Sequence, residues 1–569
     1  MKNIMKPYLY ILFTALLFSA CEKSLNLLPQ TNYSESTFFE TTDQFKLFAN
    51  QFYNQLPDVN AAGTRENYSD LVATFGGANN ISNGSYSPSP SSNLWSNSYI
   101  TIRNATYLIQ KAASADADLK SQVSVYNGEA RFFRAMAYFN LYKDFGGVPI
   151  IDKVLDLSDE DLLYGARDDR SEVVAYILSD LDTAINELHE ESDISGNDKG
   201  RVSKGAALAL KARVALFEGT WLKFRGQDGN SLLDQAITAS DALISSNQYQ
   251  LFDRRDVLED TSYRYMFILN KIKSNPASLN KDAQSEFILV NKYDNTLRPS
   301  PYHDVHGSAS PTQKLADMFL CKDGLPIDKS PLFKGSQTII SEYQNRDPRM
   351  ACDMVQPEAR FWSSYPPEYN RNWANPFEGG TIYDVNFGNT TNTGYLNHKF
   401  LPEIAPPLSV DYPVIRLAEV LLINAEAKYE RNGFISDADL DLTINKLRTR
   451  AGITKLTNAL VSNNGLDMRK EIRRERSVEL FMEGFRFDDL RRWKTAETEM
   501  PMALKGIQYA GTQYATDPRW NTIGFTLDTD GYIIVESSAK RTFTQKHYLF
   551  PLPTRQLLLN SNLKQNEGW

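Results

Sequence analysis

Cys21 is the residue near the start of the chain whose surroundings point most clearly to chemistry, because it follows two small residues at the end of an apolar run. Lys2 and Lys6 make the first residues basic, and residues 8–18 are apolar apart from one threonine. This run is too short to cross a bilayer as a helix, which takes about 20 residues. A basic start, a short apolar run and a small residue before the cut are typical of a secretory signal peptide. We expect a signal peptide over residues 1–20 and lipid attachment to the Cys21 thiol.

The match to a bacterial lipoprotein signal has one departure. Phe18 stands three residues before the cysteine, where Leu is usual, and Leu17 comes one step earlier. The alternative is a secreted protein that is cut near Ala20 and carries no lipid. Acyl chains anchor through burial of their methylenes, at about 0.8 kcal/mol each, so two or three chains hold a protein stably. In both cases the chain after residue 20 lies outside the cytoplasm.

Two histidines, His303 and His306, have the HxxH spacing of some zinc ligands. They lie in a segment rich in Pro and Ser, whereas a zinc protease carries this motif on a helix. The chain has no GxSxG motif, no Walker loop and no dinucleotide-binding fingerprint. We therefore expect no catalytic residue, no metal and no other cofactor.

The segment 471–494 is the third place where chemistry is conceivable, because its carboxylates alternate with arginines. Its acidic members are Glu471, Glu475, Glu479 and Glu483, and its basic members include Arg473, Arg474 and Arg476. A glycosidase needs two carboxyl groups that face each other across a cleft. Carboxylates four residues apart on one helix, next to arginines, favour a structural ion network instead.

Charge and cysteine content further narrow the classes of protein to which this chain can belong. The formal net charge is −9, whereas nucleic-acid binding needs clustered Lys and Arg, so we expect no nucleic-acid partner. After residue 20 no stretch of the sequence is long and apolar enough to span a membrane. Besides Cys21 the chain has only Cys321 and Cys352. These two either form a disulfide or remain free.

Aromatic residues make up 12% of the chain, and many of them lie in polar segments rich in Asn, Ser, Gly and Pro. Examples are Tyr68, Tyr86, Trp95, Tyr302, Trp362, Tyr365, Tyr369, Trp373 and Trp520. A sugar ring has an apolar face and a polar edge, so flat aromatic rings in loops are candidates for contacts with sugars. The alternative is that these rings fold back and cover a helical core.

Apolar residues recur with helical spacing in several segments, and many of these are rich in Ala and end at Gly. The predicted helices cover residues 127–144, 172–188, 204–219, 232–244, 414–433, 442–452 and 471–494. Ser203 is the predicted N-cap of the third helix, and Gly146 with Gly147 ends the first. Ala permits close approach of neighbouring helices, so the pattern indicates helix pairs stacked side by side.

The rest of the chain is predicted to be irregular. Long segments rich in Asn, Ser, Gly, Pro and aromatics cover residues 60–100, 253–310, 325–410 and 500–547, and strand-like pieces occur at 286–291 and 532–535. Loops this long are usually functional or carry irregular structure of their own. The predicted fold is therefore mainly α, a tetratricopeptide-like scaffold of helix pairs with long irregular loop insertions and a few short strands. The rigid helices would hold the loops that recognise a ligand.

Several motifs occur in an order that resembles one known family. They are LNLLPQTNYSESTFFETTDQF after Cys21, Trp95 with Tyr99, Ile102 and Asn104, EARFFRAMAYFNLYKDFGGVPI at 129–150, RVSKGAALALKARVAL at 201–216, YPVIRLAEVLLINAEA at 412–427, ERSVELFMEGFRFDDLRRW at 475–493 and YLFPLPTRQLLLNSNLKQNEGW at 548–569. Together they resemble the SusD/RagB family of outer-membrane nutrient-binding lipoproteins. One departure is Glu567, where most members of the family have Pro before the last Gly.

The resemblance implies a lipid-anchored, surface-exposed lipoprotein of the outer membrane that is not an enzyme. Members of the family carry four tetratricopeptide-like helix pairs, bind an oligosaccharide or in some cases peptides, and act as a lid over a SusC-like TonB-dependent transporter. The expected organisation is an N-terminal helical region over residues 21–250 and a C-terminal region over 251–569 packed on the same scaffold. The expected ligand is a glycan, with peptide or another nutrient as the alternative and a glycan-cleaving enzyme as the third choice.

Starch-binding members of the family use an arc of aromatic rings with flanking polar groups from loops. By position in the chain, the candidates here are Tyr68, Asp70, Asn79, Asn80, Trp95, Arg298, Tyr302, Trp362, Tyr365 and Trp373. Each stacked ring would contribute on the order of 1 kcal/mol, so affinity would depend on several rings at once. Trp95 is either part of the arc or a core residue of its helix. Trp221, beside Lys223 and Arg225, is a weaker candidate.

Overall fold

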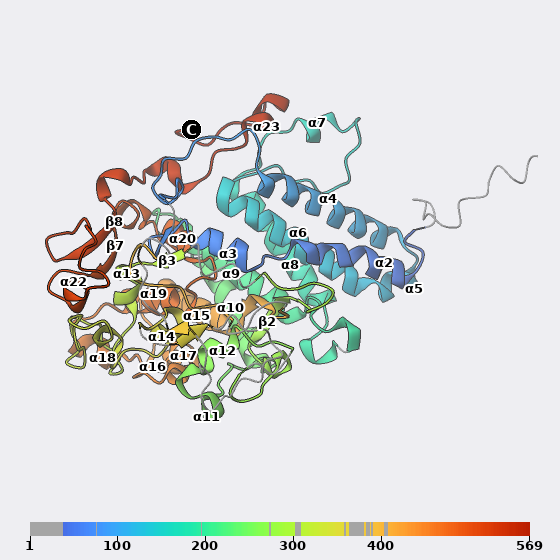
Figure 1. Cartoon of the computed structure of the whole chain (residues 1–569). Helices are drawn as coiled ribbons and strands as arrows, with labels where there is room; N and C mark the ends of the chain where they lie inside the picture. The colour runs from blue at the N-terminus through green and yellow to red at the C-terminus, as the bar shows by residue number, and fades with distance from the viewer. Residues whose placement is uncertain are drawn as a thin grey trace, which may run out of the picture.

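The computed structural model describes residues 38–74, 77–194, 196–271, 275–301, 309–357, 360–362, 381–382, 387, 391–402 and 408–569. Helices of the first half of the chain lie side by side in one part of the molecule, and short helices and strands of the second half form the other part (Figure 1). Within these residues, no helix combines the length and apolar character needed to cross a bilayer. Cys21 lies outside the described residues.

The scaffold is a row of long helices in which each helix packs on the next one along the chain. Its members are α4 (Asn93–Ser114), α6 (Ser124–Phe145), α8 (Arg170–Glu187), α9 (Lys204–Lys223), α10 (Asn230–Ser246) and α15 (Leu417–Asn432). Alanines of α9 such as Ala206 and Ala209 are buried and let α8 and α10 approach α9 from two sides. The predicted scaffold of stacked helix pairs is confirmed.

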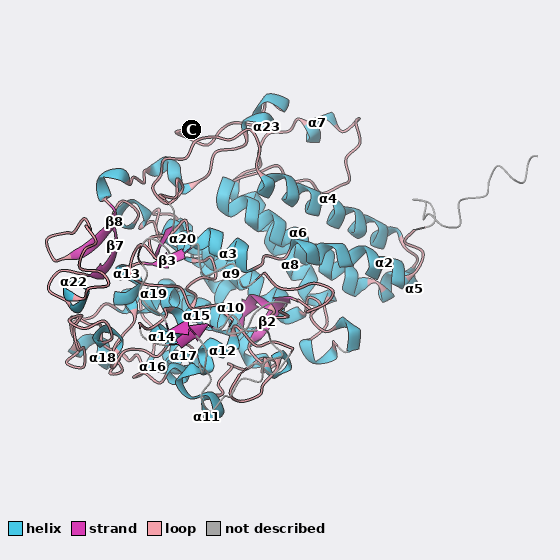
Figure 2. Ribbon diagram, viewed as in Figure 1, coloured by secondary structure: helices cyan, strands magenta, loops and turns pink. Residues whose placement is uncertain are grey.

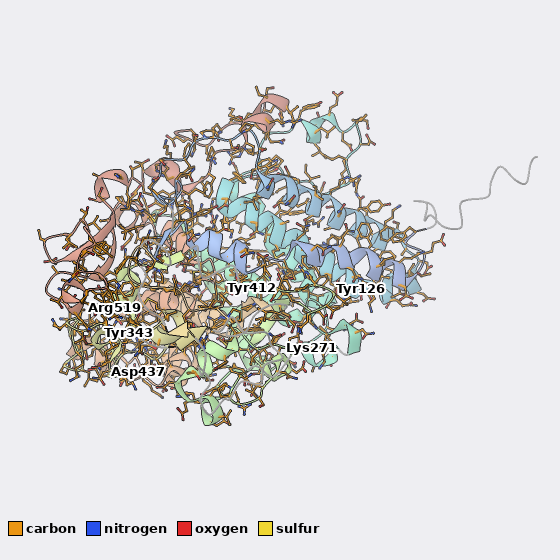
Figure 3. The ribbon with its side chains drawn as sticks, in the orientation of Figure 1. Tyr126, Lys271, Tyr343, Tyr412, Asp437 and Arg519 are labelled. Atoms are coloured by element: carbon orange, nitrogen blue, oxygen red, sulfur yellow. The ribbon has the colours of Figure 1, made fainter. Side chains whose placement is uncertain are left out.

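Shorter helices complete both parts. They are α2 (Thr42–Ala49), α3 (Val59–Glu66), α5 (Ala117–Gln122), α7 (Glu160–Leu163), α11 (Arg255–Leu258), α12 (Ser262–Met266), α13 (Gln313–Met318), α14 (Arg349–Asp353), α16 (Asp437–Leu442), α17 (Ile444–Ala451), α18 (Asn458–Asn463), α19 (Met468–Glu479), α20 (Arg486–Arg492), α21 (Ala496–Glu499), α22 (Gln513–Thr516) and α23 (Thr554–Leu559). Figure 3 shows side chains filling the space between the elements, with Tyr412 near the centre of the molecule. Tyr412 is buried there.

The described strands form four antiparallel pairs, which appear as separate magenta arrows in Figure 2. The pairs are β1 (Val72–Thr74) with β3 (Ala309–Pro311), β2 (Phe287–Asn291) with β6 (Tyr412–Arg416), β4 (Arg360–Trp362) with β5 (Thr381–Ile382), and β7 (Leu504–Gln508) with β8 (Tyr532–Glu536). The two predicted strand segments correspond to β2 and β8. Two of the four pairs, β1 with β3 and β2 with β6, join segments far apart in the chain and so tie the long connections to the rest of the fold.

Predicted helix ends are confirmed where a local signal sets them. The Ser203 hydroxyl accepts a hydrogen bond from the Ala206 main-chain nitrogen at 3.2 Å and caps α9. Gly146 ends α6 with a φ of 79°, a value that glycine adopts without strain. Gly452 likewise ends α17 with a φ of 74°.

Three sequence predictions are wrong in detail. Residues 414–416 lie in β6, because Ile415 pairs with Leu289 of β2, and α15 begins only at Leu417. The predicted helix over 471–494 is two helices, α19 and α20, separated by a turn in which Met482 and Gly484 have φ values of 61° and 81°. The segment 60–100, predicted to be irregular, contains most of α3 and the start of α4, whose N-caps are Asp58 and Ser92.

The acidic series of α19 and the turn after it is a buried ion network, as predicted, but most of its partners lie on other elements. Arg349 donates to Glu475 at 2.7 Å and to Glu479 at 2.8 Å. Arg416 contacts Glu479, Glu483 and Glu286, all within 2.8 Å. Burial alone would raise the pKa of Glu479, but three surrounding guanidinium groups hold that pKa well below its usual range. These carboxylates hold the fold together, and Glu483, which also lines a cavity, is paired there with Arg416 and Lys399.

The two remaining cysteines do not pair in this structure. Cys321 and Cys352 are both buried free thiols. Burial raises the pKa of Cys352 to about 12, which keeps this thiol protonated and unreactive at neutral pH. Of the two possibilities for these cysteines, a disulfide or two free thiols, this structure has two free thiols.

Candidate ligand-binding site

A cavity of about 190 Å³ opens where the turn after β1 meets the β7–β8 hairpin, and we call it the β1–β3 cavity. Its walls are Val72, Ala73, Thr74, Gly77, Ala78, Asn79, Ser82, Asn392, Leu504, Val535, Glu536 and Lys540. These residues come from four separate parts of the sequence. The cavity therefore exists only once the long connections have folded onto the scaffold.

Main-chain contacts fix the floor of the cavity. Thr74 of β1 pairs with Ala309 of β3, and the Asn392 side-chain amide donates to the Thr74 carbonyl oxygen at 3.1 Å. On the other side, the Ile507 main-chain nitrogen donates to the Thr393 carbonyl oxygen at 2.8 Å. Residues 391–393 thus join β1 to β7.

Two polar atoms in the cavity wall have no hydrogen-bond partner in the described structure. They are the Thr74 hydroxyl oxygen and the Asn392 side-chain oxygen, both buried. A buried polar atom without a partner costs about 1–3 kcal/mol, and native proteins satisfy nearly all such atoms through protein, water or ligand. Both atoms lie beneath the surface of the cavity wall, so the hydroxyl groups of a ligand can bind them once the two side chains turn toward the cavity.

Asn79 lies at the rim in a tight turn. Its side-chain oxygen accepts hydrogen bonds from the main-chain nitrogens of Ile81 and Ser82, at 3.0 and 3.1 Å. Both bonds use the oxygen, so the amide nitrogen Nδ2 remains as a donor toward a ligand. The neighbouring Asn80 is exposed and holds the turn through its main-chain oxygen.

The C-terminal segments hold this turn in place. The Thr542 main-chain nitrogen donates to Asn83 at 2.9 Å, and Arg541 donates to the Ser82 hydroxyl at 3.1 Å. Arg541 also pairs with Glu536 at 2.6 Å, so the wall carboxylate is neutralised. Lys540 is exposed and has no ion-pair partner among the described residues. The polar wall of the cavity thus combines neutral donors and acceptors with one cation.

Two of the predicted site residues are buried in internal contacts. Asp70 is 2% exposed and lies between Arg486, at 2.9 Å, and Lys314, at 2.6 Å. Burial alone would raise its pKa, but these two cations hold the Asp70 pKa well below its usual range. Trp95 is 6% exposed and packs on Tyr99 and Phe145. Of the two predictions for Trp95, the structure therefore supports a core residue of its helix.

Tyr68 and Arg298 lie outside the walls of the cavity. The Tyr68 ring is partly buried and packs edge-on against Phe487. Arg298 donates to the Asn291 side-chain oxygen at 2.7 Å and lies over the Tyr293 ring, on the connection that follows β2. Of the predicted residues that the structure describes with side chains, only Asn79 lines the cavity.

The remaining predicted residues fall where side chains are not described. Tyr302, Tyr365 and Trp373 lie outside the described residues, as do His303 and His306. Trp362 is described only through its main chain, which pairs with Thr381 in the β4–β5 hairpin.

Thr74, Asn392 and Lys540 are wall residues that the sequence did not reveal. Thr, Asn and Lys are common in loops, so residue type gave no signal. The three side chains come together only because β1 pairs with β3 and residues 391–393 contact β7. The one usable signal was the Asn79–Asn80 pair, because asparagine favours turns that leave side-chain donors exposed.

Two family models match the chain. A model described as the SusD family matches residues 267–569, and a model described as starch-binding associating with outer membrane matches residues 24–216. Among curated proteins, a SusD-like protein of Bacteroides ovatus is 26% identical over 517 residues, which cover 87% of this chain and 83% of that protein. A SusD-like protein of Formosa agariphila is 23% identical over 514 residues, which cover 86% and 90%.

Solved structures share the fold. A SusD-like protein of Bacteroides fragilis superposes with a TM-score of 0.71 at 23% identity, over 94% of this chain and 99% of that one. A SusD-like carbohydrate-binding protein of the same species gives a TM-score of 0.70 at 22% identity, over 93% and 100%. A laminarin-binding SusD-like protein gives 0.59 at 20% identity, over 93% and 100%.

Proposed function

The chain belongs to the SusD family, and we propose on that premise that it captures a nutrient glycan at the outer membrane and passes it to a SusC-like TonB-dependent transporter. It would act as a binding protein and not as an enzyme. The description of the second matching model, starch-binding associating with outer membrane, supports both the ligand class and the location.

The observation that carries the ligand class is the β1–β3 cavity. It offers two unpartnered acceptor atoms, on Thr74 and Asn392, and one free amide donor on Asn79. A sugar presents adjacent hydroxyl groups, each of which both donates and accepts, so one sugar unit satisfies all three atoms. The printed names of two structural relatives, one carbohydrate-binding and one laminarin-binding, agree with this ligand class.

Attachment to the membrane would come from the lipid on Cys21, for which the sequence pattern around residues 1–21 is the support. Membership of the SusD family supports the proposed lid role over a transporter. Neither role requires a charged or catalytic group in the β1–β3 cavity, whose one wall carboxylate is paired with Arg541.

Thr74→Val tests the cavity directly, because valine keeps the shape of threonine and removes the unpartnered hydroxyl. Removing a buried polar atom without a partner should leave the melting temperature unchanged or raise it slightly. Losing a hydrogen bond to the ligand should weaken glycan binding about fivefold or more, as measured by isothermal titration with the best-bound oligosaccharide. Asn521→Asp, on an exposed loop, is the control. Unchanged affinity in Thr74→Val would remove this cavity from the proposal.

A further inference from the structure

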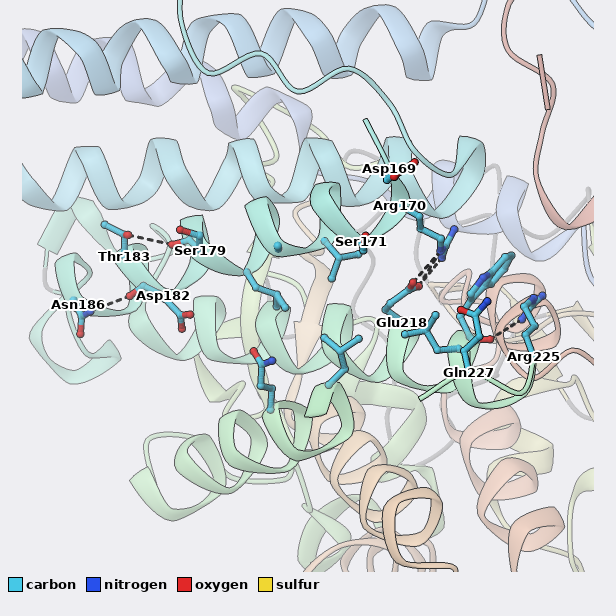
Figure 4. Close-up of a pocket in the computed structure, with 17 residues that line it drawn as sticks. Asp169, Arg170, Ser171, Ser179, Asp182, Thr183, Asn186, Glu218, Arg225 and Gln227 are labelled. Atoms are coloured by element: carbon cyan, nitrogen blue, oxygen red, sulfur yellow. Dashed lines mark hydrogen bonds and ion pairs between the residues drawn. The ribbon is translucent and has the colours of Figure 1, made fainter. Parts of the chain in front are cut away.

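A much larger cavity, of about 840 Å³, opens on the helical scaffold between α8, α9 and α10, and we call it the α8–α10 cavity. Figure 4 shows Arg170, Glu218 and Arg225 at one end and Ser179, Asp182, Thr183 and Asn186 at the other. None of its lining residues is shared with the β1–β3 cavity. Ligand pockets in proteins typically measure about 300–1,000 Å³, so this cavity has room for more than one sugar unit.

One end of this cavity carries two guanidinium groups, those of Arg170 and Arg225, next to the carboxylates of Asp169 and Glu218. Arg170 donates to both oxygens of Glu218 at 2.8–3.0 Å, so these two opposite charges neutralise each other. Arg225 is different, because its guanidinium donates to main-chain oxygens, those of Trp221 and Arg491, both at 3.1 Å. Among the described residues no carboxylate lies within ion-pair distance of Arg225. Burial lowers the pKa of Arg225 to about 10, so its charge is poorly stabilised by the groups around it.

The indole of Trp221 holds both guanidinium groups in position. The Arg170 carbon Cζ lies 4.1 Å from the ring centroid and that of Arg225 lies 3.5 Å from it. Such contacts fix the planes of the two arginines at little cost in solvation. Asp182, the carboxylate at the opposite end, is paired with Lys211 and so does not cancel the charge of Arg225.

Polar side chains along the walls complete the site. Gln227 is exposed at the mouth beside Arg225, and Asn186 uses its amide nitrogen on the Asp182 main-chain oxygen at 3.0 Å, which leaves its side-chain oxygen as an acceptor. Val174, Leu178 and Leu232 add an apolar strip. The walls are helices whose main-chain groups are paired internally, so an extended peptide would find no strand edge to pair with.

We propose that the α8–α10 cavity is a second ligand site, which binds a uronic acid unit of an acidic saccharide through its carboxylate against Arg225. The hydroxyl groups of the sugar contact Gln227 and the other wall amides, and its apolar face lies on the strip of Val174 and Leu178. This site goes beyond the glycan capture proposed for the β1–β3 cavity. It would select saccharides by charge through a guanidinium held between helices, whereas the one cation in the wall of the β1–β3 cavity, Lys540, is exposed to solvent.

Isothermal titration of the full chain in detergent, with digalacturonic acid and neutral galactobiose as probes, tests the site. We expect digalacturonic acid to bind about tenfold more tightly than galactobiose, and Arg225→Gln to abolish that difference, since a charge-assisted hydrogen bond is lost. Arg225→Lys, which keeps the charge, should retain most of the difference in affinity between the two disaccharides. Arg431→Gln, at an exposed ion pair with Asp234, is the matched control.

Gln227 supplies a second pair of variants, because its exposed side chain makes no hydrogen bond with the described residues and its replacement should not disturb folding. Gln227→Glu should weaken binding of digalacturonic acid about fivefold and Gln227→Lys should strengthen it, while galactobiose is unaffected. Equal binding of the two disaccharides, or an acidic dipeptide that binds as well as digalacturonic acid, would overturn the proposal. Loss of digalacturonic acid binding in Thr74→Val would also overturn it, because the acid would then occupy the β1–β3 cavity.

Discussion

Asp70 illustrates how a polar residue next to a candidate site can serve the fold. It directly precedes Leu71 and β1, and from the sequence its carboxylate was a plausible partner for sugar hydroxyls. In the structure both oxygens accept from Arg486, which is 416 residues away in the chain, and one also meets Lys314. Residue type alone did not reveal this, because the partners are brought in by tertiary folding. Asn79, whose turn is set by its own neighbours, is the predicted residue that lines the cavity.

Replacing Asp70 by Asn should destabilise the protein without changing ligand affinity in the folded fraction. Removing one member of a buried ion pair typically costs about 3–5 kcal/mol, because the remaining cations lose their partner. The two cations lower the Asp70 pKa in the folded state, so the stabilisation is present above the pKa of the unfolded state, about 3.9, and is lost as pH falls.

The difference in unfolding free energy between wild type and Asp70→Asn should therefore be constant near neutral pH and narrow below about pH 4. Urea titrations from pH 7 to pH 3 would measure it, with Asp530→Asn at an exposed position as the control. A difference that stays constant down to pH 3 would contradict the ion-pair role of Asp70.

Helices and turns differ in how far local sequence sets them. The helix ends at Ser203, Gly146 and Gly452 follow from caps that lie within a few residues, and these were predicted. The change from strand β6 to helix α15 was not predicted, because it depends on the pairing of residues 412–416 with β2. The break after Glu479 was also missed, since the turn is held by contacts of Glu483 with Arg416.

Gly84 is the glycine on which the turn at the β1–β3 cavity most depends. Its φ is +76°, and a Cβ atom there would overlap the main-chain oxygen of Thr542. Gly84→Ala should therefore displace the turn that carries Asn79, lower the unfolding free energy by more than about 2 kcal/mol and weaken glycan binding.

Gly433→Ala is the matched control for this variant, because Gly433 has a φ of +71° and nothing within 4 Å of the added atom. It should cost only the backbone strain, about 1 kcal/mol, and leave glycan affinity unchanged. Thermal unfolding and isothermal titration of both variants provide the comparison. Equal effects of the two substitutions would show that the close approach to Thr542 is unimportant.

At the scale of the molecule, a helical scaffold and a set of irregular connections are joined by buried charge. The repeating helical pattern was enough to predict the scaffold. The β1–β3 cavity was not predictable in the same way, because its walls come from residues 72–74, 77–82, 392, 504 and 535–540. The ion network around Glu479 links α14, β6, α17 and α19 and so holds these elements of the second half to one another.

Glu479→Gln should be among the most destabilising substitutions of similar size in the chain. It leaves Arg349, Arg416 and Arg450 with one fewer carboxylate in a buried place, at a cost of about 3–5 kcal/mol. Glu190→Gln, at a half-exposed pair with Lys204, should cost less than about 1 kcal/mol. Melting temperatures of the two variants measure the contrast, and similar values would contradict the structural role of the network.

Affinity electrophoresis of the protein through gels that contain plant, host or microbial polysaccharides is the most direct test of glycan capture. We expect retardation by one class of polymer, with Trp fluorescence quenching by its oligosaccharides, and weaker retardation of Thr74→Val. If no polysaccharide retards the wild-type protein while peptides bind to it, glycan capture is contradicted and peptide capture takes its place.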